Sequence, residues 1–599
     1  MSRFLLVSLN IRAILQETTL YRRREKLSRM ANGWGLGDAY DATIGRIKMQ
    51  EGERSRLGMA ALMWLSHSER PLDVDEMCEA LAVEIGSTDL DFRNVPSRRT
   101  VLGCCQGLAT VDNGSSTIRL IHSTLKEYLS RHPDLFSRAH SKMAETCLTY
   151  LNFQSNKRLL ERPSFARSMS RQPKHFLRYS SLYWGTHMRM ELSDRSRCLA
   201  LDLLDRYENH ISAELLWGSV STQYSVHITR RNLWNKPVSA LHCISHFGIA
   251  EVGIDFIKRG RRDVNQRDPA GLTPLMWAAR RGHEEVVKLL LRQKYIRPDI
   301  PDTTYGRTAL SWGAGCGNEG VVRLFLSRLF VNPGGIGLWW RKAPRVMSLL
   351  FGRKYVNPGR PDDNGQTPLS WAAENGHDGV VKLLLGRKDV SPDISDNGGR
   401  APLLLAAGNG HDRVVKLLLK RKDVTSDRPD NGGQTPLLLA ARNGHAGVVK
   451  LLLGREDVNS GKPDRYGRTP LSWATRNGCD GVVKLLLDSE GVNPDMPDNN
   501  GQRPLSLAAQ NGHDEVVRLL LEQEDVSPDS PDNDGQTPLS WAAKNGHDRV
   551  VKLLLEREDI SPDMPDKNGQ TPLLLAVGNG HDGVVKLFKA RKAATHHVV

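Results

Sequence analysis

The sequence has few cysteines and no long apolar run. Its 599 residues include 8 cysteines, none of them in a C-x-x-C pair, which argues against a disulfide scaffold and favours a reducing compartment. The apolar run Phe4–Leu9 is too short for the core of a signal peptide. No stretch approaches the roughly 18 apolar residues of a membrane span. We therefore expect a soluble, cytoplasmic protein without membrane contact, with the nucleus as the alternative location.

Signatures of catalysis are also missing. The sequence contains no G-x-S-x-G, no H-E-x-x-H, no kinase signature and no phosphate-binding loop G-x-x-x-x-G-K-[ST]. Gly461 and Lys462 come nearest to that loop, but Pro463 follows them and all three lie inside a repeat. We therefore predict that the chain is not an enzyme and has no catalytic residue, cofactor, metal ligand or small-molecule substrate.

Basic residues outnumber acidic ones by 83 to 68, which gives a formal net charge of +15. An excess of this size raises the question of binding to nucleic acid or an anionic membrane. Acids and bases are mixed along most of the chain, however, and an ordinary solvated surface is the favoured interpretation.

What dominates the second half is a repeat of 34 residues (for example 401 − 367 = 34). The first helical Pro-Leu of each copy follows one of these residues: Thr367, Ala401, Thr435, Thr469, Arg503, Thr537 and Thr571. Earlier copies start at Gly271 and Gly306, and a weaker one starts at Ser239. The spacing breaks near 327–362, where we expect a degenerate copy. Such self-similarity is the signature of a stacked repeat architecture.

One copy, starting at Asn364, shows how the unit folds. Thr367 is suited to cap a helix and Pro368 to occupy its first turn. Asn375-Gly376 is a helix stop, because glycine adopts the left-handed conformation readily. A second apolar helix follows, and then a stretch rich in Pro, Asp, Asn and Gly that turns the chain into the next copy. The unit is therefore predicted to be helix, turn, helix and hairpin.

The pattern G-x-T-P-L-x-x-A-A-x-x-G-H…V-V-x-L-L-L is similar to the ankyrin repeat. The resemblance runs from Ser239 to Phe588, in about ten or eleven copies. It implies a mostly α-helical solenoid with a long concave face of first helices and hairpin tips. Two departures are visible: Ser370, Leu404 and Met276 replace the usual histidine, and Ala401 and Arg503 replace the capping threonine, at a cost of about 1 kcal/mol each.

Three columns of the repeat vary freely while the apolar positions hardly change. They lie at the end of the first helix, in the hairpin and at the hairpin tip, where the resemblance places partner contacts. A surface that only needs solubility would vary in the same way. The partner-binding candidates from these columns are Glu374, Arg442, Arg476, Gln510, Lys544, Arg428, Lys462, Met496 and Tyr466.

Two further columns of the repeat can be interpreted either as structural or as functional. Trp277, Trp312, Trp371, Trp473 and Trp541 share one position. Packing between repeats is the favoured interpretation, and a row of aromatic anchors is the alternative, for which Trp371, Trp473 and Trp541 are the candidates. His-Asp pairs also recur at one position, which indicates a fold element and not catalysis or metal binding. They are His377-Asp378, His411-Asp412, His513-Asp514, His547-Asp548 and His581-Asp582.

The first 240 residues contain no repeat. Three helical stretches and two short alternating runs around Asn113-Gly114 predict a winged helix. This segment, with Arg70–Leu72 and Ile121–Leu129, resembles the winged-helix module of fungal NACHT–ankyrin proteins, whose nucleotide switch does not carry over because the phosphate loop is missing. The expected domains are 1–55, a remnant of the NACHT region; 56–135, a winged helix; 136–234, a helical connector; 235–592, the ankyrin array; and 593–599, a tail.

A protein-binding scaffold, acting in signalling or non-self recognition as the resemblance implies, is the function that the sequence favours. Its protein partner is not identified by the sequence. The alternative is nucleic-acid binding through Arg98 and Arg99 of the third winged-helix stretch, Arg119 of the wing and the basic connector from Lys157 to Arg178. That third stretch is more apolar than a groove-reading helix usually is, which makes nucleic acid the less favoured partner.

Overall fold

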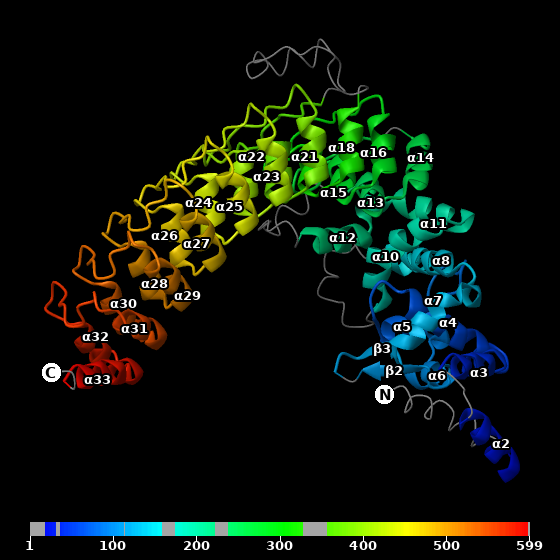
Figure 1. Ribbon diagram of the computed structural model, residues 1–599. Helices are drawn as coiled ribbons and strands as arrows, with labels where there is room; N and C mark the ends of the chain where they lie inside the picture. The colour runs from blue at the N-terminus through cyan, green and yellow to red at the C-terminus, as the bar shows by residue number, and fades with distance from the viewer. Residues whose placement is uncertain are drawn as a thin grey trace. The chain divides into compact units, whose positions relative to one another are not determined.

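The computed structural model describes residues 18–31, 36–112, 114–157, 174–221, 238–260, 262–327 and 356–596. The chain divides into two compact units, residues 1–278 with 285–294 and residues 279–284 with 295–599. The division falls inside the repeat array (Figure 1). Each unit therefore contains copies of the repeat, and each is described by itself.

Three helices and a small sheet form the N-terminal part of the first unit. The helices are α4 (Glu53–His67), α5 (Val74–Ala82) and α6 (Arg98–Cys104), and the strands are β1 (Leu72–Asp73), β2 (Ala109–Asp112) and β3 (Thr117–Leu120). The antiparallel order is β1-β3-β2, with Ile118 opposite both Leu72 and Val111. This arrangement confirms the predicted winged helix and adds β1, which the sequence did not indicate. Asn113 of the predicted turn lies outside the described residues.

The remaining elements of the first unit before the repeats are helical. They are α2 (Leu20–Ala31), α3 (Leu36–Lys48), η1 (Phe92–Asn94), α7 (Ser123–Arg131), η2 (Pro133–Phe136), α8 (Ala139–Leu151), α9 (Gln154–Lys157), α10 (Phe176–Met190), α11 (Asp194–Leu204), η4 (Tyr207–Asn209) and α12 (Ile211–Ser221). Trp64 of α4 meets Phe176 of α10 edge-on, with ring centroids 5.5 Å apart. Both rings are buried, so aromatic packing joins the winged helix to the helices that follow it.

The first two copies of the repeat contribute α13 (Ala240–Phe247), α14 (Ala250–Lys258), α15 (Pro274–Arg281) and α16 (Glu284–Leu291). His242 occupies the position at which later copies have Ser, Leu or Met. Its ring is fully buried and lies 3.0 Å from the carbonyl oxygen of Leu272, in the next copy. The first copy therefore keeps a histidine hydrogen bond between repeats that the other copies lack at this position.

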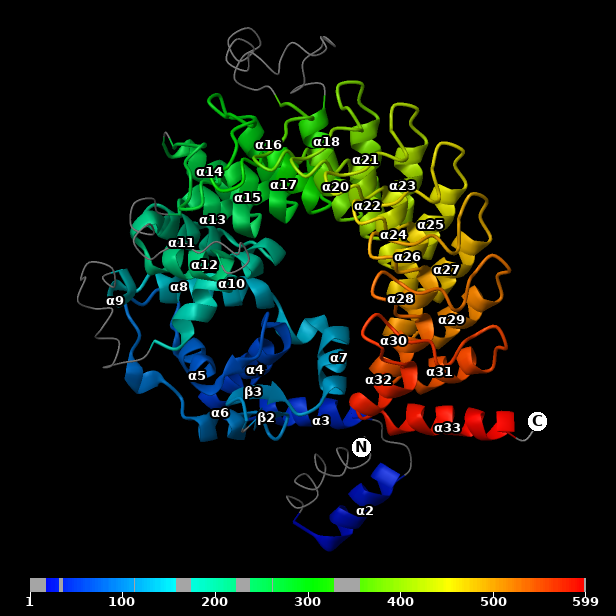
Figure 2. The ribbon, with the colours of Figure 1, turned by 90° about the vertical axis from the view of Figure 1, so that its left-hand side faces the viewer.

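In the second unit the copies form two parallel rows of helices (Figure 2). The first helices are α17 (Ala309–Gly315), α20 (Pro368–Glu374), α22 (Pro402–Gly408), α24 (Pro436–Arg442), α26 (Pro470–Arg476), α28 (Pro504–Asn511), α30 (Pro538–Asn545) and α32 (Pro572–Gly578). The second helices are α18 (Glu319–Leu326), α21 (Asp378–Leu385), α23 (Asp412–Leu419), α25 (Ala446–Leu453), α27 (Asp480–Leu487), α29 (Asp514–Leu521), α31 (Asp548–Leu555) and α33 (Asp582–His596).

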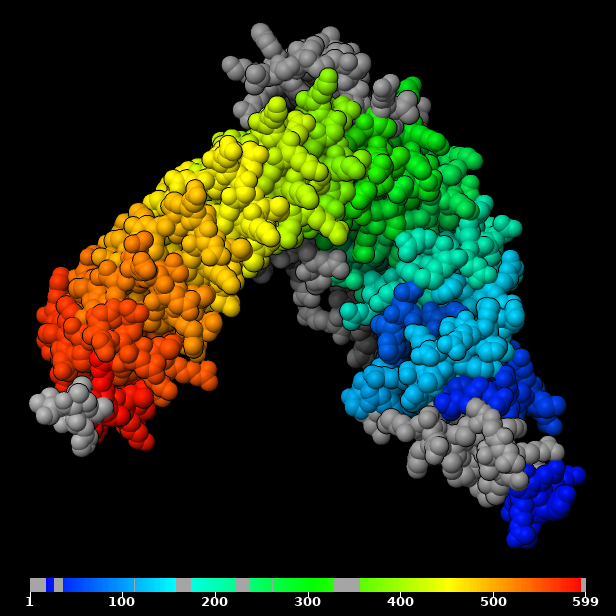
Figure 3. Space-filling model, in the orientation of Figure 1, coloured from blue at the N-terminus to red at the C-terminus, as the bar shows by residue number. Residues whose placement is uncertain are grey.

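Each copy is built as its sequence predicts. Thr367 accepts a hydrogen bond from the Ser370 amide at 3.1 Å, and the Ser370 hydroxyl oxygen accepts one from the Thr367 amide. The two residues therefore form a capping box. Ala401 and Arg503 provide no side-chain cap, as predicted. The space-filling view shows the copies from yellow to red packed directly against one another (Figure 3), which confirms the predicted solenoid.

The predicted degenerate copy near 327–362 lies mostly outside the described residues, as do residues 158–173 of the basic connector. Among the helices that are described, none combines the length and the apolar character needed to cross a bilayer. The predicted domain boundaries remain predictions.

Three buried histidines of the first unit make its stability depend on pH. Burial lowers the pKa of His187 to about 3 and the pKa values of His210 and His242 to about 4. Each ring is almost completely enclosed: His187 lies 2.9 Å from the Tyr179 hydroxyl, and His210 lies 3.0 Å from the Leu151 carbonyl oxygen. The unfolded chain takes up protons below about pH 6.5, where these folded rings do not.

Acidification from pH 7 to pH 5 is therefore expected to destabilise the first unit, by about 2 kcal/mol for each of these histidines. The measurement is a urea titration followed by hydrogen exchange in α8 and α10, because one probe of the whole chain would mix the two units. In the variant His187→Gln, which has no titrating ring at this position, the loss should be smaller by about one histidine's share. An identical loss in the variant and the native chain would contradict the assignment.

Candidate functional site

The tryptophan column is fixed by buried carboxylates of the hairpins. Trp371 donates its indole N–H to Asp362 at 2.8 Å, Trp473 to Asp464 at 2.9 Å, and Trp541 to Asp532 at 2.9 Å. Trp277 and Trp312 make the same bond, to Asp268 and Asp302. Each carboxylate precedes its tryptophan by nine or ten residues, so the indole is held between its own first helix and its own hairpin.

The second oxygen of the same aspartates shapes the hairpin tip. Asp464 Oδ1 accepts the backbone N–H groups of Tyr466 and Arg468 at 2.9 and 3.0 Å. The same pair of bonds recurs at Asp362, Asp396, Asp430, Asp498, Asp532 and Asp566. These aspartates were not among the site residues predicted from the sequence. The sequence does contain a pattern that could have identified them: an Asp stands two residues before each variable residue of the hairpin-tip column, as Asp464 does before Tyr466.

In three of the copies where leucine replaces tryptophan (Leu405, Leu507 and Leu575), the Oδ2 atom that accepts from the indole elsewhere has another partner. Asp498 accepts from Arg468 of the preceding copy at 3.3 Å, and Asp566 accepts from Gln536 of the preceding copy, also at 3.3 Å. Asp396 pairs instead with Arg400 of its own hairpin. In these three copies, an arginine or a glutamine thus takes the place of the indole N–H.

Cations gather on the half-buried tryptophans. Around Trp473 lie the guanidinium groups of Arg442, Arg468 and Arg476, whose central carbons are 4.5, 4.9 and 5.7 Å from the ring centroid. Lys544 Nζ lies 4.9 Å from the centroid of Trp541. A cation over an indole face at these distances is attracted by the ring quadrupole. We call Arg442, Arg468, Trp473 and Arg476 the Trp473 cluster.

Arg307 shows the same chemistry in a buried form. Its guanidinium lies 4.0 Å from the centroid of Trp312 and 3.6 Å from that of Trp371, and the residue is 8% exposed. Burial lowers the pKa of Arg307 to about 10, so the group stays charged at neutral pH. A side chain on Gly315 would collide with it, since a Cβ there would lie 2.8 Å from an Arg307 nitrogen. This sandwich packs two copies together.

The other predicted site residues have differing surroundings. Arg428 donates to the Asp393 carbonyl oxygen at 3.1 Å, and Lys462 lies 2.8 Å from the Asp427 carboxylate, so both join their hairpin to the preceding one. Glu374 accepts from Gln366 at 2.8 Å. Met496 and Gln510 are half-buried, whereas Tyr466 is 65% exposed at a hairpin tip. Arg442, Arg476 and Trp473 are thus brought together, and Tyr466 lies beside Arg468. Arg428 and Lys462 instead bond to the preceding hairpin.

The histidines of the five His-Asp pairs, and His445 in the same column, bond neighbouring copies to one another. In six copies the histidine ring reaches back to a carbonyl oxygen at the end of the preceding first helix, at 2.9 to 3.1 Å, in the residues His377, His411, His445, His513, His547 and His581. Cys479 occupies this position in the copy that carries Trp473. The Arg442 carbonyl oxygen, which a histidine there would meet, accepts only from Asn477 Nδ2, at 2.7 Å, among the described bonds.

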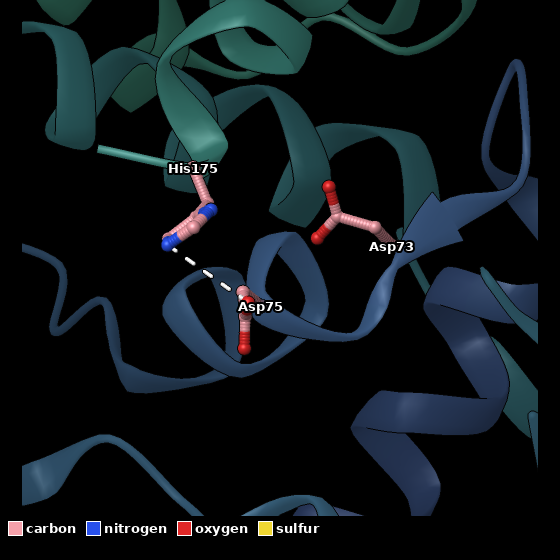
Figure 4. Close-up of side chains that lie close together, drawn as sticks. All are labelled: Asp73, Asp75 and His175. Carbon is pink, nitrogen blue, oxygen red and sulfur yellow. Dashed lines mark ion pairs between the residues drawn. The ribbon is translucent and has the colours of Figure 1, made fainter. Parts of the chain in front are cut away.

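One group of metal-ligating side chains stands close together within the described residues: Asp73, Asp75 and His175 (Figure 4). His175 Nε2 lies 3.9 Å from the Asp75 carboxylate. Asp73 accepts the Glu76 amide at 2.7 Å, and Glu76 accepts the Asp73 amide at 3.1 Å, which is a capping box at the start of α5. The group is thus explained by the start of a helix, and we assign no metal to it.

The three arginines of the nucleic-acid alternative lie on the winged helix. Arg98 and Arg99 are exposed at the start of α6, whose other face is closed by Val101 and Cys104. Arg119 of β3 lies 3.2 Å from the Asp112 carboxylate, so its charge is partly met within the wing. Of these three arginines, Arg98 and Arg99 are therefore the two for which no ion pair is found within the described residues.

Comparisons with known proteins agree with this architecture. The profile of the family described as ankyrin repeats (three copies) matches residues 241–333, 341–430, 421–498, 482–564 and 505–596. A second profile, described as the winged helix domain of GPI inositol-deacylase, matches residues 47–141. The search of curated proteins found no match.

The missing histidine at Cys479 gives a stability prediction. Cys479→His is expected to add the bond between copies, because the Gly408 carbonyl oxygen accepts from both Asn443 and His445 in the equivalent place. We expect a gain of about 0.5–1.5 kcal/mol, the usual net value of one hydrogen bond. The check is protection from hydrogen exchange in α24 and α26 during a urea titration.

The matched control is His445→Cys, which should lose a similar amount in α22 and α24. A variant Cys479→His that is no more protected than the native chain would show that the histidine column does not hold the copies together.

Proposed function

Because the chain belongs to the ankyrin-repeat family, we propose that it is a protein-binding scaffold whose partner contacts the row of first helices at Trp371, Trp473 and Trp541. Ankyrin repeats generally mediate interactions between proteins. The observation that carries the location is the Trp473 cluster, where an aromatic ring and arginines stand together at a half-exposed position. Tryptophan and arginine are the residue types most enriched in the energetic centres of protein interfaces.

The charged ends of the first helices support the same location. Arg442, Arg476 and Lys544 occupy one column, and no ion pair to a carboxylate joins any of them within the described residues. Arg428 and Lys462, the charged hairpin candidates, are committed to neighbouring copies. The proposal therefore drops these two from the contact surface and keeps the helix-end column.

The proposed role is recognition and not catalysis, since the ankyrin-repeat family is typically non-enzymatic and the second profile names a winged-helix module. We further propose a place in signalling or non-self recognition of the NACHT–ankyrin type, on the resemblance of Arg70–Leu72 and Ile121–Leu129. The proposed location is the cytoplasm, or the nucleus, because the eight cysteines remain thiols.

Nucleic-acid binding is the second candidate, supported by the exposed Arg98 and Arg99 of α6. It predicts that the full chain binds random duplex DNA at low salt and releases it steeply as salt is raised. It also predicts that Arg98→Gln with Arg99→Gln abolishes this binding. Absence of binding by the native chain at low salt removes the candidate.

The scaffold proposal is tested by capture on the immobilised full chain. The triple variant Arg442→Gln, Arg476→Gln and Lys544→Gln should lose proteins that the native chain retains from a cell extract, because it removes three cations from the first-helix row. The control Lys450→Gln, Lys484→Gln and Lys552→Gln removes the same charge from the second helices of the same three copies, where all three lysines are exposed.

The control should retain what the native chain retains, identified by quantitative mass spectrometry. If the triple variant and its control hold the same proteins in the same amounts, the first-helix row is not the contact surface.

A further inference from the structure

Three guanidinium groups from two copies converge on one ring in the Trp473 cluster. Arg442 comes from the end of α24, Arg476 from the end of α26, and Arg468 from the hairpin that leads into α26. Their spacing is set by the backbone and by the indole, which is itself fixed to Asp464 at 2.9 Å. Like charges are therefore held close together on a rigid support, an arrangement that an anion would stabilise.

The protein supplies little negative charge to balance them. Arg468 meets Asp498, a carboxylate that is almost completely buried and that already accepts two backbone N–H groups. Asp464 is also buried and is engaged by Trp473 and two backbone amides. Arg442 and Arg476 have no ion pair within the described residues, whereas Arg421, Arg455 and Arg557 elsewhere in the array each meet an aspartate at 2.7 to 2.9 Å.

From this unmet charge we propose that the Trp473 cluster binds an acidic segment of a partner protein, with anionic oxygens between Arg442 and Arg476 over Trp473. Guanidinium groups hold carboxylate and phosphate oxygens through paired N–H donors, so glutamate, aspartate and phosphoserine side chains share the chemistry. Tyr466, exposed at the adjacent hairpin tip with its ring 5.7 Å from Arg468, adds an aromatic surface beside the charges. The inference rests on the proposed function and specifies its partner.

A short acidic segment fits better than a nucleic acid. The helix-end column reads Gly408, Arg442, Arg476 and Gln510 along four successive copies, and Glu374 stands one copy earlier. Gln510 separates these two arginines from Lys544, so the column does not form the continuous basic track that a phosphate backbone requires.

The experiment measures binding of three labelled peptides to the full chain by fluorescence anisotropy. The peptides are identical except at four alternate positions, which carry glutamate, phosphoserine or glutamine, and each contains one tyrosine. The glutamate or the phosphoserine peptide should bind at least ten-fold more tightly than the glutamine peptide. The tighter of the two identifies carboxylate or phosphate as the source of the anion.

Variants locate the site. Arg442→Gln with Arg476→Gln should weaken the acidic peptide about ten-fold, the size expected for two half-buried charge pairs. Gln510 occupies the same column, so the array accepts glutamine there. Trp473→Leu should also weaken binding, and leucine stands at this position in the neighbouring copies at Leu439 and Leu507. The control Lys450→Gln with Lys484→Gln, in the same two copies, should bind as the native chain does.

Equal binding of all three peptides, no binding of either acidic peptide, or equal weakening by the control would overturn the inference. Displacement of the acidic peptide by duplex DNA at lower concentration than by unlabelled peptide would overturn it in favour of nucleic acid. If the capture experiment still depends on Arg442, Arg476 and Lys544 in these cases, the scaffold stands and only the acidic partner is wrong. If capture is also unchanged, the scaffold surface fails as well.

Discussion

In six places along the repeat array, neighbouring copies meet where a glycine contacts the histidine ring of the next copy. Gly376 has a φ of 75°, and a Cβ built there would lie 2.5 Å from His411 Nδ1. The same ring reaches the Glu374 carbonyl oxygen at 2.9 Å. Because glycine has no side chain, Gly376 can both end its helix and let the next copy approach closely. This close approach helps to set the distance between successive first helices.

The sequence predicted the helices well because local signals determine them. Thr-Pro at one end and Asn-Gly at the other fix each first helix without help from the rest of the chain. The turn signal around Gly114 likewise located the strands of the wing. By contrast, β1 spans two residues and exists only because Leu72 and Asp73 pair with Ile118 and Thr117 of a distant strand.

The candidate site was predicted only in part. Columns of variable residues located Arg442 and Arg476, but Arg428 and Lys462 vary in the same way and are bonded to the preceding hairpin. Variation between copies does not distinguish a side chain that faces solvent from one that meets a neighbour. The sequence likewise does not tell a buried Arg–Trp contact from an exposed one. Arg307 and Arg442 both lie on indole rings, yet Arg307 is enclosed between two rings and Arg442 is half-exposed.

The hairpin aspartates make neighbouring copies unequal. A tryptophan donates to Oδ2 of the aspartate in its own hairpin. In the copies with Leu507 and Leu575, this oxygen accepts instead from Arg468 and Gln536 of the copy before. A tryptophan in place of Leu507 or Leu575 would therefore compete for an oxygen that now bonds to the copy before. Duplication or recombination that exchanged either of these units within the gene would change how it is bonded to its neighbour, so the order of the two kinds of unit affects how the array is held together.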